Sequence, residues 1–149
     1  MPQTHGDVLL HLVFSTKNRQ PLIGPASKSR LHGYLGGILR EMKGYPIIIN
    51  GMPDHVHLLG TIPLTKSIAD LVRELKTNSS KWMHDQNLGQ NFEWQRGYGV
   101  FSVSRSNLEK VSKYIENQEF HHKNRSFQEE YLWFLKELGL EYDPRYIWD

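Results

Sequence analysis

Two histidines stand one residue apart in the stretch MPDHVHLLG, residues 52–60. The segment from His55 to Leu59 is otherwise apolar, which is typical of a buried β-strand. Because side chains alternate between the faces of a strand, His55 and His57 are predicted to project from one face with their Cα atoms about 7 Å apart. Two imidazoles at this spacing can bind one cation. A structural zinc site needs four N or S ligands, so the pair indicates either local packing or an open catalytic site with a further ligand.

A second group of chemically capable residues lies in KYIENQEFHH, residues 113–122. Tyr114 and Gln118 are four residues apart, so on a helix they would share a face, where a phenol and an amide can reach the same small region. The pair His121 and His122 we interpret as a solvated helix end. Taken alone, each of these patterns is also compatible with ordinary surface or packing residues.

The length and composition of the chain limit the classes of protein to which it can belong. With 149 residues and 17.5 kDa, the chain is predicted to form a single domain spanning residues 1–149. Eighteen Lys and Arg against sixteen Asp and Glu give a formal net charge of +2, which permits nucleic-acid binding without requiring it. The absence of cysteine excludes disulfides, thiolate metal sites and thiol nucleophiles. No stretch of ~20 apolar residues is present, so we expect a soluble cytoplasmic protein.

Hydrophobic periodicity and turn residues divide the chain into strands and helices. The predicted strands cover residues 8–14, 45–50, 55–62 and 92–104, and the predicted helices cover 27–43, 67–84, 106–123 and 126–139. This order predicts an α+β, ferredoxin-like βαββαβ fold: an antiparallel sheet with helices on one face, plus C-terminal helices that carry the tyrosine. The first and third strands would be central, which places the histidine pair on a central strand. Capping boxes are predicted at Ser67, Ser106 and Ser126.

The two motifs together resemble a known family. The element from Met52 to Leu59, followed about 50 residues later by Tyr-Ile-x-Asn-Gln at residues 114–118, is similar to the single-tyrosine HUH transposases. These are the small insertion-sequence transposases and the REP-associated tyrosine transposases. The resemblance implies a transposase that binds single-stranded hairpin DNA and cleaves and rejoins it through a 5′-phosphotyrosine intermediate.

Carried onto this sequence, the resemblance assigns Tyr114 as the nucleophile and His55, His57 and Gln118 as ligands of a divalent ion, Mg²⁺ or Mn²⁺. Such an ion would withdraw charge from the scissile phosphate and orient it. The resemblance to the insertion-sequence members also implies a homodimer in which the tyrosine acts in trans. The base that deprotonates Tyr114 stays open, with His121 and a metal-bound water as candidates.

Basic and aromatic side chains are available to hold a DNA strand. Cations would contact phosphates, and Trp94 or Tyr98 would stack on an unpaired base. The predicted phosphate contacts are Lys17, Arg19, Arg73, Lys76, Lys81, Arg96 and Arg105.

Three other functions compete with transposition. A non-catalytic binder of single-stranded nucleic acid would use the same sheet scaffold, and the stretch RGYGVF at residues 96–101 is a faint echo of an RNA-binding motif. A domesticated HUH endonuclease would cut host palindromic repeats by the same chemistry. A metal-dependent phosphoesterase would use His55 and His57 with an activated water and would not need Tyr114.

Overall fold

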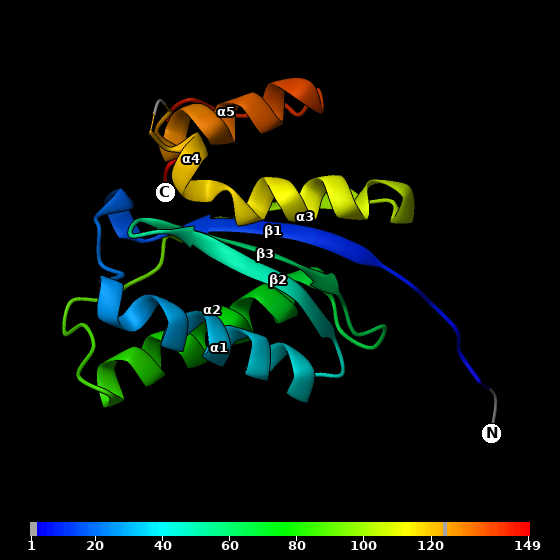
Figure 1. The fold of residues 1–149 in the computed structure, drawn as a ribbon, viewed down its shortest axis with the longest axis horizontal. Helices are drawn as coiled ribbons and strands as arrows, with labels where there is room; N and C mark the ends of the chain where they lie inside the picture. The colour runs from blue at the N-terminus through cyan, green and yellow to red at the C-terminus, as the bar shows by residue number, and fades with distance from the viewer. Residues whose placement is uncertain (1–2, 124) are drawn as a thin grey trace.

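Four strands form one antiparallel sheet with the order β2-β3-β1-β4 in a computed structural model, which describes residues 3–123 and 125–149 (Figure 1). The strands are β1 (Leu9–Ser15), β2 (Tyr45–Met52), β3 (His55–Thr61) and β4 (Gly99–Val103). The predicted ferredoxin-like α+β fold is confirmed, and β1 and β3 are central.

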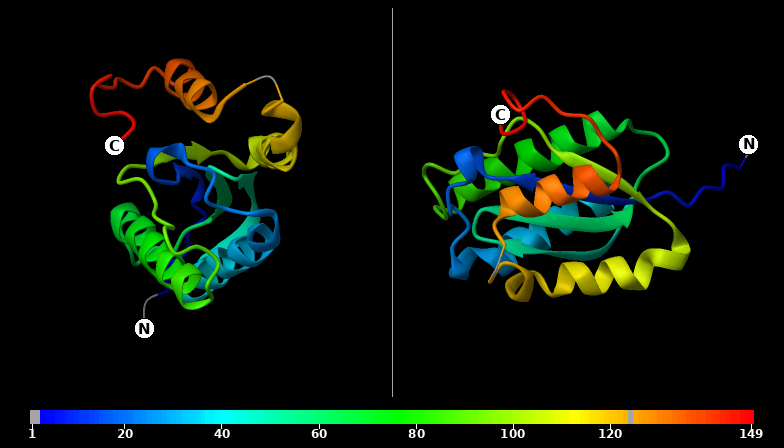
Figure 2. Two further views of the ribbon diagram at one scale, coloured as in Figure 1. Left: turned by 90° about the vertical axis from the view of Figure 1, so that its left-hand side faces the viewer. Right: turned by 90° about the horizontal axis from the view of Figure 1, so that it is seen from above.

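Helices cover both faces of this sheet, as Figures 1 and 2 show. One face carries α1 (Pro25–Glu41) and α2 (Ile68–Asp85), and the opposite face carries α3 (Leu108–Glu116), α4 (Gln118–His121) and α5 (Phe127–Glu137). Two short 3₁₀ helices, Lys17–Arg19 and Arg105–Asn107, follow β1 and β4. None of the helices in the described part of the chain has the length and apolar character needed to cross a membrane.

The alternation of side chains along β3 separates the core from the histidines. Val56 and Leu58 face α1 and α2 and belong to the main hydrophobic core. His55 and His57 face the opposite side, beneath the C-terminal helices, and both are fully buried. The strand is fixed on both sides, since His57 lies opposite Val13 of β1 and Asn50 of β2. The prediction of a central strand that presents both histidines on one face is therefore confirmed.

The predicted strand over residues 92–104 is too long. Only Gly99–Val103 forms β4, and Trp94 makes an isolated bridge with Thr16. The carbonyl oxygens of residues 95–97 turn toward the Lys76 ammonium group, which donates to them at 2.8, 3.2 and 2.6 Å. The Lys76 side chain therefore satisfies these carbonyl oxygens, while the backbone N–H of Gln95 still donates to the Ser15 carbonyl oxygen at 3.0 Å.

The predicted helix over residues 106–123 is interrupted. Asn117, with φ −93° and ψ 28°, separates α3 from α4. The predicted capping box at Ser106 is absent, because the Ser106 hydroxyl pairs with that of Ser104 at 2.9 Å. The Ser126 capping box is confirmed, and the Ser67 hydroxyl accepts a hydrogen bond from the backbone N–H of Asp70 as predicted.

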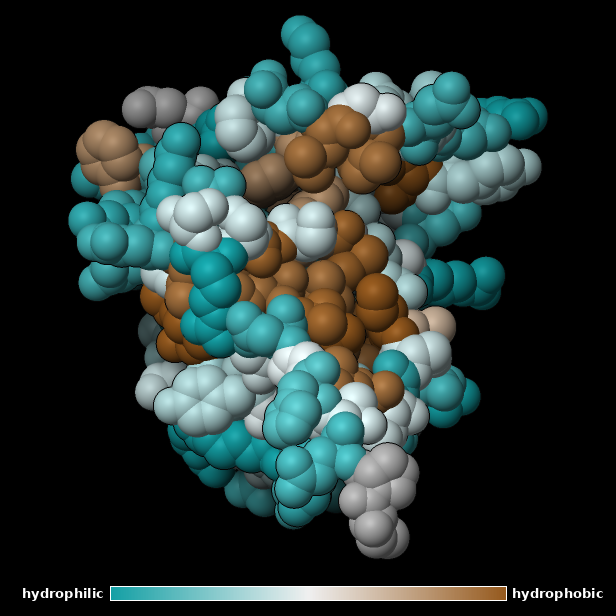
Figure 3. All heavy atoms as spheres, turned by 90° about the vertical axis from the view of Figure 1, so that its right-hand side faces the viewer, coloured by the Kyte–Doolittle hydropathy of each residue, from teal (hydrophilic) through white to brown (hydrophobic). Residues whose placement is uncertain are grey.

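Apolar side chains gather in a broad patch at one end of the molecule, on the face shown in Figure 3. Within the described chain, several large apolar residues are more than one third exposed, among them Val8, Leu138 and Leu140. Extended apolar patches are uncommon on monomeric proteins and often mark interaction surfaces.

Candidate metal and nucleophile site

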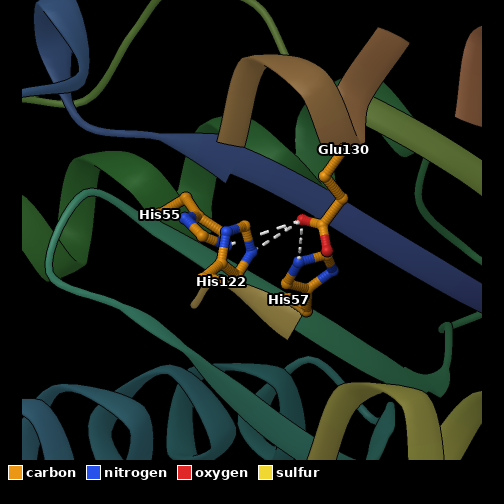
Figure 4. Close-up of side chains that lie close together, drawn as sticks. All are labelled: His55, His57, His122 and Glu130. Carbon is orange, nitrogen blue, oxygen red and sulfur yellow. Dashed lines mark hydrogen bonds and ion pairs between the residues drawn. The ribbon is translucent and has the colours of Figure 1, made fainter. Parts of the chain in front are cut away.

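Four side chains from three segments converge between the sheet and α5. His55 and His57 rise from β3, Glu130 descends from α5, and His122 approaches from the end of α4 (Figure 4). One ligand atom from each lies within 4.8 Å of all the others. Gln118 joins them, since its Oε1 lies 3.1 Å from Nε2 of both His55 and His122.

The hydrogen-bond partners of His55 suit a cation ligand. Its Nδ1 lies 2.7 Å from the Oδ1 of Asp54, and a carboxylate there takes the single N–H of a neutral imidazole. The Nε2 then presents a lone pair to the Gln118 carbonyl oxygen, which is also an acceptor, at 3.1 Å. Two lone pairs facing each other at this distance repel unless a cation or an additional proton lies between them. The donor set therefore fits a divalent cation.

His57 is held between a buried histidine and the Glu130 carboxylate. Its Nδ1 lies 2.7 Å from the Nε2 of the buried His11 and its Nε2 lies 2.9 Å from Glu130 Oε1. Burial lowers the pKa of His57 and also lowers the pKa of His11 well below its usual range. Both rings are therefore neutral near pH 7, the state in which imidazole binds metals.

Glu130 is a fully buried carboxylate at the centre of the group. Burial acts to raise its pKa, but hydrogen bonds from His122 and His57 dominate and hold the pKa well below its ordinary value. The pKa of His122 is raised, because the contacts with Glu130 outweigh the effect of burial. The carboxylate is therefore ionised, and it supplies negative charge to a site that the sequence predicted to contain only neutral ligands.

Tyr114 lies against this carboxylate. Its hydroxyl donates a short hydrogen bond to Glu130 Oε2, and Arg125 Nη2 donates to the same hydroxyl at 3.0 Å. Burial, followed by the negative charge of Glu130, raises the pKa of Tyr114. The hydroxyl is therefore protonated at neutral pH. The His121 ring stacks on the Tyr114 ring with a centroid distance of 4.4 Å and makes no hydrogen bond to the hydroxyl.

The structure brings together all four predicted site residues: His55, His57, Tyr114 and Gln118. Tyr114 and Gln118 lie on either side of the break at Asn117, yet both reach Glu130, Gln118 through its Nε2 at 3.4 Å. These contacts join the predicted nucleophile and a predicted cation ligand to one carboxylate.

Two members of the cluster were not predicted from the sequence. The interpretation of His122 as a solvated helix end is wrong, because its side chain is only 6% exposed and points to Glu130. The sequence does contain a signal for Glu130, because this residue shares the buried face of α5 with Phe127, Tyr131 and Leu135. A carboxylate on an apolar helix face needs buried partners.

The predicted DNA-contacting cations lie outside the cluster, and most have protein partners. Lys17 pairs with Glu93, Arg73 with Asp70 and Arg105 with Asp7, at 3.3, 3.0 and 2.6 Å. The Arg19 guanidinium donates to the Trp148 carbonyl oxygen at 3.3 Å, and Lys76 is engaged by the carbonyls of residues 95–97. Lys81 and Arg96 are exposed.

Arg73, Lys76 and Arg96 share one open cavity of about 440 Å³ on the α2 side. Tyr98 lines it and is partly exposed, so it is available for stacking on a base. Trp94 is only 7% exposed and donates through its indole nitrogen to Ser79, so the prediction of a stacking role now favours Tyr98.

Comparison with known proteins agrees with this geometry. The profile of the family described as "Transposase IS200 like" matches residues 4–118. The chain belongs to this transposase family. The ISDra2 transposase TnpA of Deinococcus radiodurans is 32% identical over 120 residues, which cover 72% of this chain and 81% of that protein. The transposase for insertion sequence element IS200 of Salmonella typhimurium is 30% identical over 129 residues, covering 79% of this chain and 81% of that protein.

Solved structures show the same fold. A crystal structure described as a candidate transposase from Deinococcus radiodurans has a TM-score of 0.61 and 27% identity, and the match covers 79% of this IS200-like chain and 98% of that one. A REP-associated tyrosine transposase bound to a REP hairpin has a TM-score of 0.60 and 16% identity, with 82% and 73% of the two chains covered. Membership of a transposase family implies an enzyme that cleaves DNA and transfers strands.

Proposed function

We propose that this IS200-like transposase cleaves and rejoins single-stranded DNA with Tyr114 as its nucleophile. The observation that carries the proposal is the link between Tyr114 and His57 through one carboxylate, Glu130, which joins the nucleophile to the cation donors. Neither a nucleic-acid-binding module nor a phosphoesterase that activates water needs a tyrosine at this position.

The chemistry follows from the side chains. The Tyr114 hydroxyl loses its proton and its oxygen forms a bond to phosphorus, while the bond from phosphorus to the 3′ oxygen breaks. The 3′ oxygen takes up a proton and leaves as a free 3′-OH, and the downstream strand stays attached as a 5′-phosphotyrosine. His55, His57 and Gln118, with His122 and Glu130 as additional donors, would hold a divalent ion that withdraws charge from the phosphate. Mg²⁺ and Mn²⁺ are the proposed ions, and imidazole ligands favour Mn²⁺ over Mg²⁺. A phenol is a better leaving group than an alkyl alcohol, so the step can be reversed to rejoin strands.

The proposed substrate is a single-stranded DNA with hairpin ends. Support comes from the REP-associated tyrosine transposase of the same fold, which is bound to a REP hairpin. Arg73 and Arg96 line the α2-side cavity together with Tyr98 and offer phosphate contacts there, and Lys81 is a further exposed cation. Lys17, Arg19 and Arg105 would have to exchange their present partners for phosphate, and Lys76 has a structural role that competes with DNA.

The test uses single-stranded oligonucleotides from the DNA flanking the gene, labelled at the 3′ end, with Mn²⁺ or with EDTA. We expect label on the denatured protein in Mn²⁺ only, and none with Tyr114→Phe; Tyr142→Phe, at an exposed tyrosine, is the control. Cleavage without an adduct would favour the phosphoesterase, and binding without cleavage would favour the non-catalytic module. Imperfect palindromes around the gene would separate a mobile element from a domesticated endonuclease.

The oligomeric state has its own test. The resemblance predicts a homodimer with Tyr114 in trans, and the apolar patch in Figure 3 supports an interface with a second copy. The contact of Tyr114 with Glu130 of its own chain instead supports action in cis. Mixing Tyr114→Phe with His57→Ala decides between them: activity returns if the tyrosine acts in trans and stays absent if it acts in cis. Sedimentation velocity of the wild-type protein tests separately whether it is a dimer in solution.

A further inference from the structure

Glu130 occupies a position that ordinary packing does not explain. The other inward residues of α5 are Phe127, Tyr131 and Leu135, and an apolar residue would complete this stripe. A carboxylate with 0% exposure is costly unless every oxygen has partners. Glu130 meets that condition only because of the groups around it, and all of those groups belong to the candidate site.

The two oxygens of this carboxylate have different partners. Oε1 lies 2.9 Å from His57 Nε2, 3.3 Å from His122 Nε2 and 3.6 Å from His55 Nε2. Oε2 accepts the hydrogen bond from Tyr114 and a longer one from Gln118 at 3.4 Å. One oxygen therefore faces the imidazole donors, while the other faces the nucleophile.

Glu130 also comes from a segment beyond the family match, which ends at residue 118. The family profile covers the two histidines, the tyrosine and the glutamine, while α5 adds the carboxylate. The capping box at Ser126 fixes the start of this helix, and Phe127 packs against the His55 ring with a centroid distance of 4.6 Å. These contacts hold Glu130 in place over β3.

We propose that Glu130 couples the nucleophile to the cation site, with Oε1 as a cation ligand and Oε2 as the acceptor that positions the Tyr114 hydroxyl. The proposal rests on the proposed function for the role of Tyr114. An acceptor on the cation side of the phenol holds its oxygen close to where a phosphate bound by the cation would lie, and such orientation contributes strongly to rate. Loss of Glu130 should then weaken cation binding and slow the tyrosine reaction as two separable effects.

The central variant is Glu130→Gln, which keeps the shape and removes the charge. Glu137→Gln, at an exposed position on the same helix, is the matched control. In DNA-free protein we expect Glu130→Gln to weaken Mn²⁺ binding about tenfold or more, measured by electron paramagnetic resonance of free Mn²⁺. At saturating Mn²⁺ and oligonucleotide, the single-turnover rate of adduct formation should remain at least about tenfold below that of the wild type, with the oligonucleotide Kd unchanged.

A second measurement needs no activity. Tyr114→Phe removes the hydrogen bond to Oε2, so we expect it to change the Mn²⁺ affinity of the wild type but not that of Glu130→Gln. This non-additivity in a double-mutant cycle is the signature of coupling. Additive effects would overturn the proposal.

Other outcomes are equally decisive. If Glu130→Gln forms the adduct at the normal rate at saturating Mn²⁺, Glu130 is a cation ligand only. If Glu130→Gln binds Mn²⁺ with unchanged affinity, Glu130 serves only to hold α5 in place. Either result overturns the coupling. If the wild type forms no adduct, the proposed function fails, while the cation measurements still decide the role of Glu130.

Discussion

The side-chain amide of Asn50 donates to the Ile115 carbonyl oxygen at 2.9 Å, so an edge strand of the sheet holds the end of the helix that carries Tyr114. The same Nδ2 also lies 3.1 Å from the Glu116 carbonyl oxygen. Both carbonyls precede the break at Asn117, where the helix leaves its last acceptors without intrahelical partners. Asn50 therefore holds the end of the Tyr114 helix against β2.

Replacing Asn50 with Ala should loosen this helix end. We expect the adduct rate to fall about tenfold, because Tyr114 loses its fixed position. The free energy of unfolding should fall by about 1–2 kcal/mol for the lost hydrogen bonds. Single-turnover labelling and urea denaturation measure the two effects. Asn78→Ala, at an exposed position on α2, serves as the control, and equal losses in both variants would contradict the assignment.

Asp54 orients His55 through the Nδ1 contact at 2.7 Å. Removing the carboxylate with Asp54→Ala should lower Mn²⁺ affinity about 10- to 100-fold, because the imidazole is no longer fixed in the tautomer that directs a lone pair at the site. Calorimetric titration of Mn²⁺ into DNA-free protein tests this. Asp85→Ala, at an exposed position at the end of α2, should leave the affinity unchanged.

Lys76 and Arg73 line the same cavity, and variants of the two residues should separate an effect on stability from an effect on DNA binding. Lys76→Met leaves three carbonyls without their donor, so it should lower the free energy of unfolding by about 2–3 kcal/mol. Arg73→Gln should leave stability unchanged, weaken oligonucleotide binding, and reduce the slope of log Kd against log salt by about one. A large loss of DNA affinity for Lys76→Met with normal stability would restore Lys76 as a phosphate contact.

His32 on α1 makes the fold sensitive to acid. Burial lowers its pKa to about 4, and its Nε2 has no hydrogen-bond partner within the described chain. Between pH 6.5 and 4 the unfolded chain binds a proton that the folded chain does not, so stability is complete above pH 6.5 and falls as the pH drops toward 4. The loss reaches at most about 3 kcal/mol. Urea titrations at several pH values should show a flatter profile for His32→Leu.

Local patterns in the sequence were sufficient for the framework of the site. Period-two alternation places His55 and His57 on one face, and the order of elements places their strand in the centre of the sheet. The family motif then links Tyr114 and Gln118 to them. These features are set by neighbours in the sequence or by a known topology, so they are accessible without coordinates.

The features that were missed depend on contacts between distant segments. β4 begins only after residues 95–97, whose carbonyl oxygens accept hydrogen bonds from the Lys76 ammonium group, and no local sequence pattern predicts that contact. Glu130 and His122 enter the site because α5 packs back across the sheet after the chain turns beyond α4. Their signal was only a carboxylate on an apolar stripe and a histidine near a helix end.

The pairing of β3 with both β1 and β2 also fixes which face of the sheet the two histidines occupy. A slip of one residue would turn Val56 and Leu58 toward α5 and press both imidazoles into the apolar layer beneath α1 and α2. Such a chain would lose its core and its cation donors together. The register that builds the hydrophobic core is therefore the same register that places His55 and His57 on the face beneath α5. A molecule with an intact core also has both histidines at the candidate site.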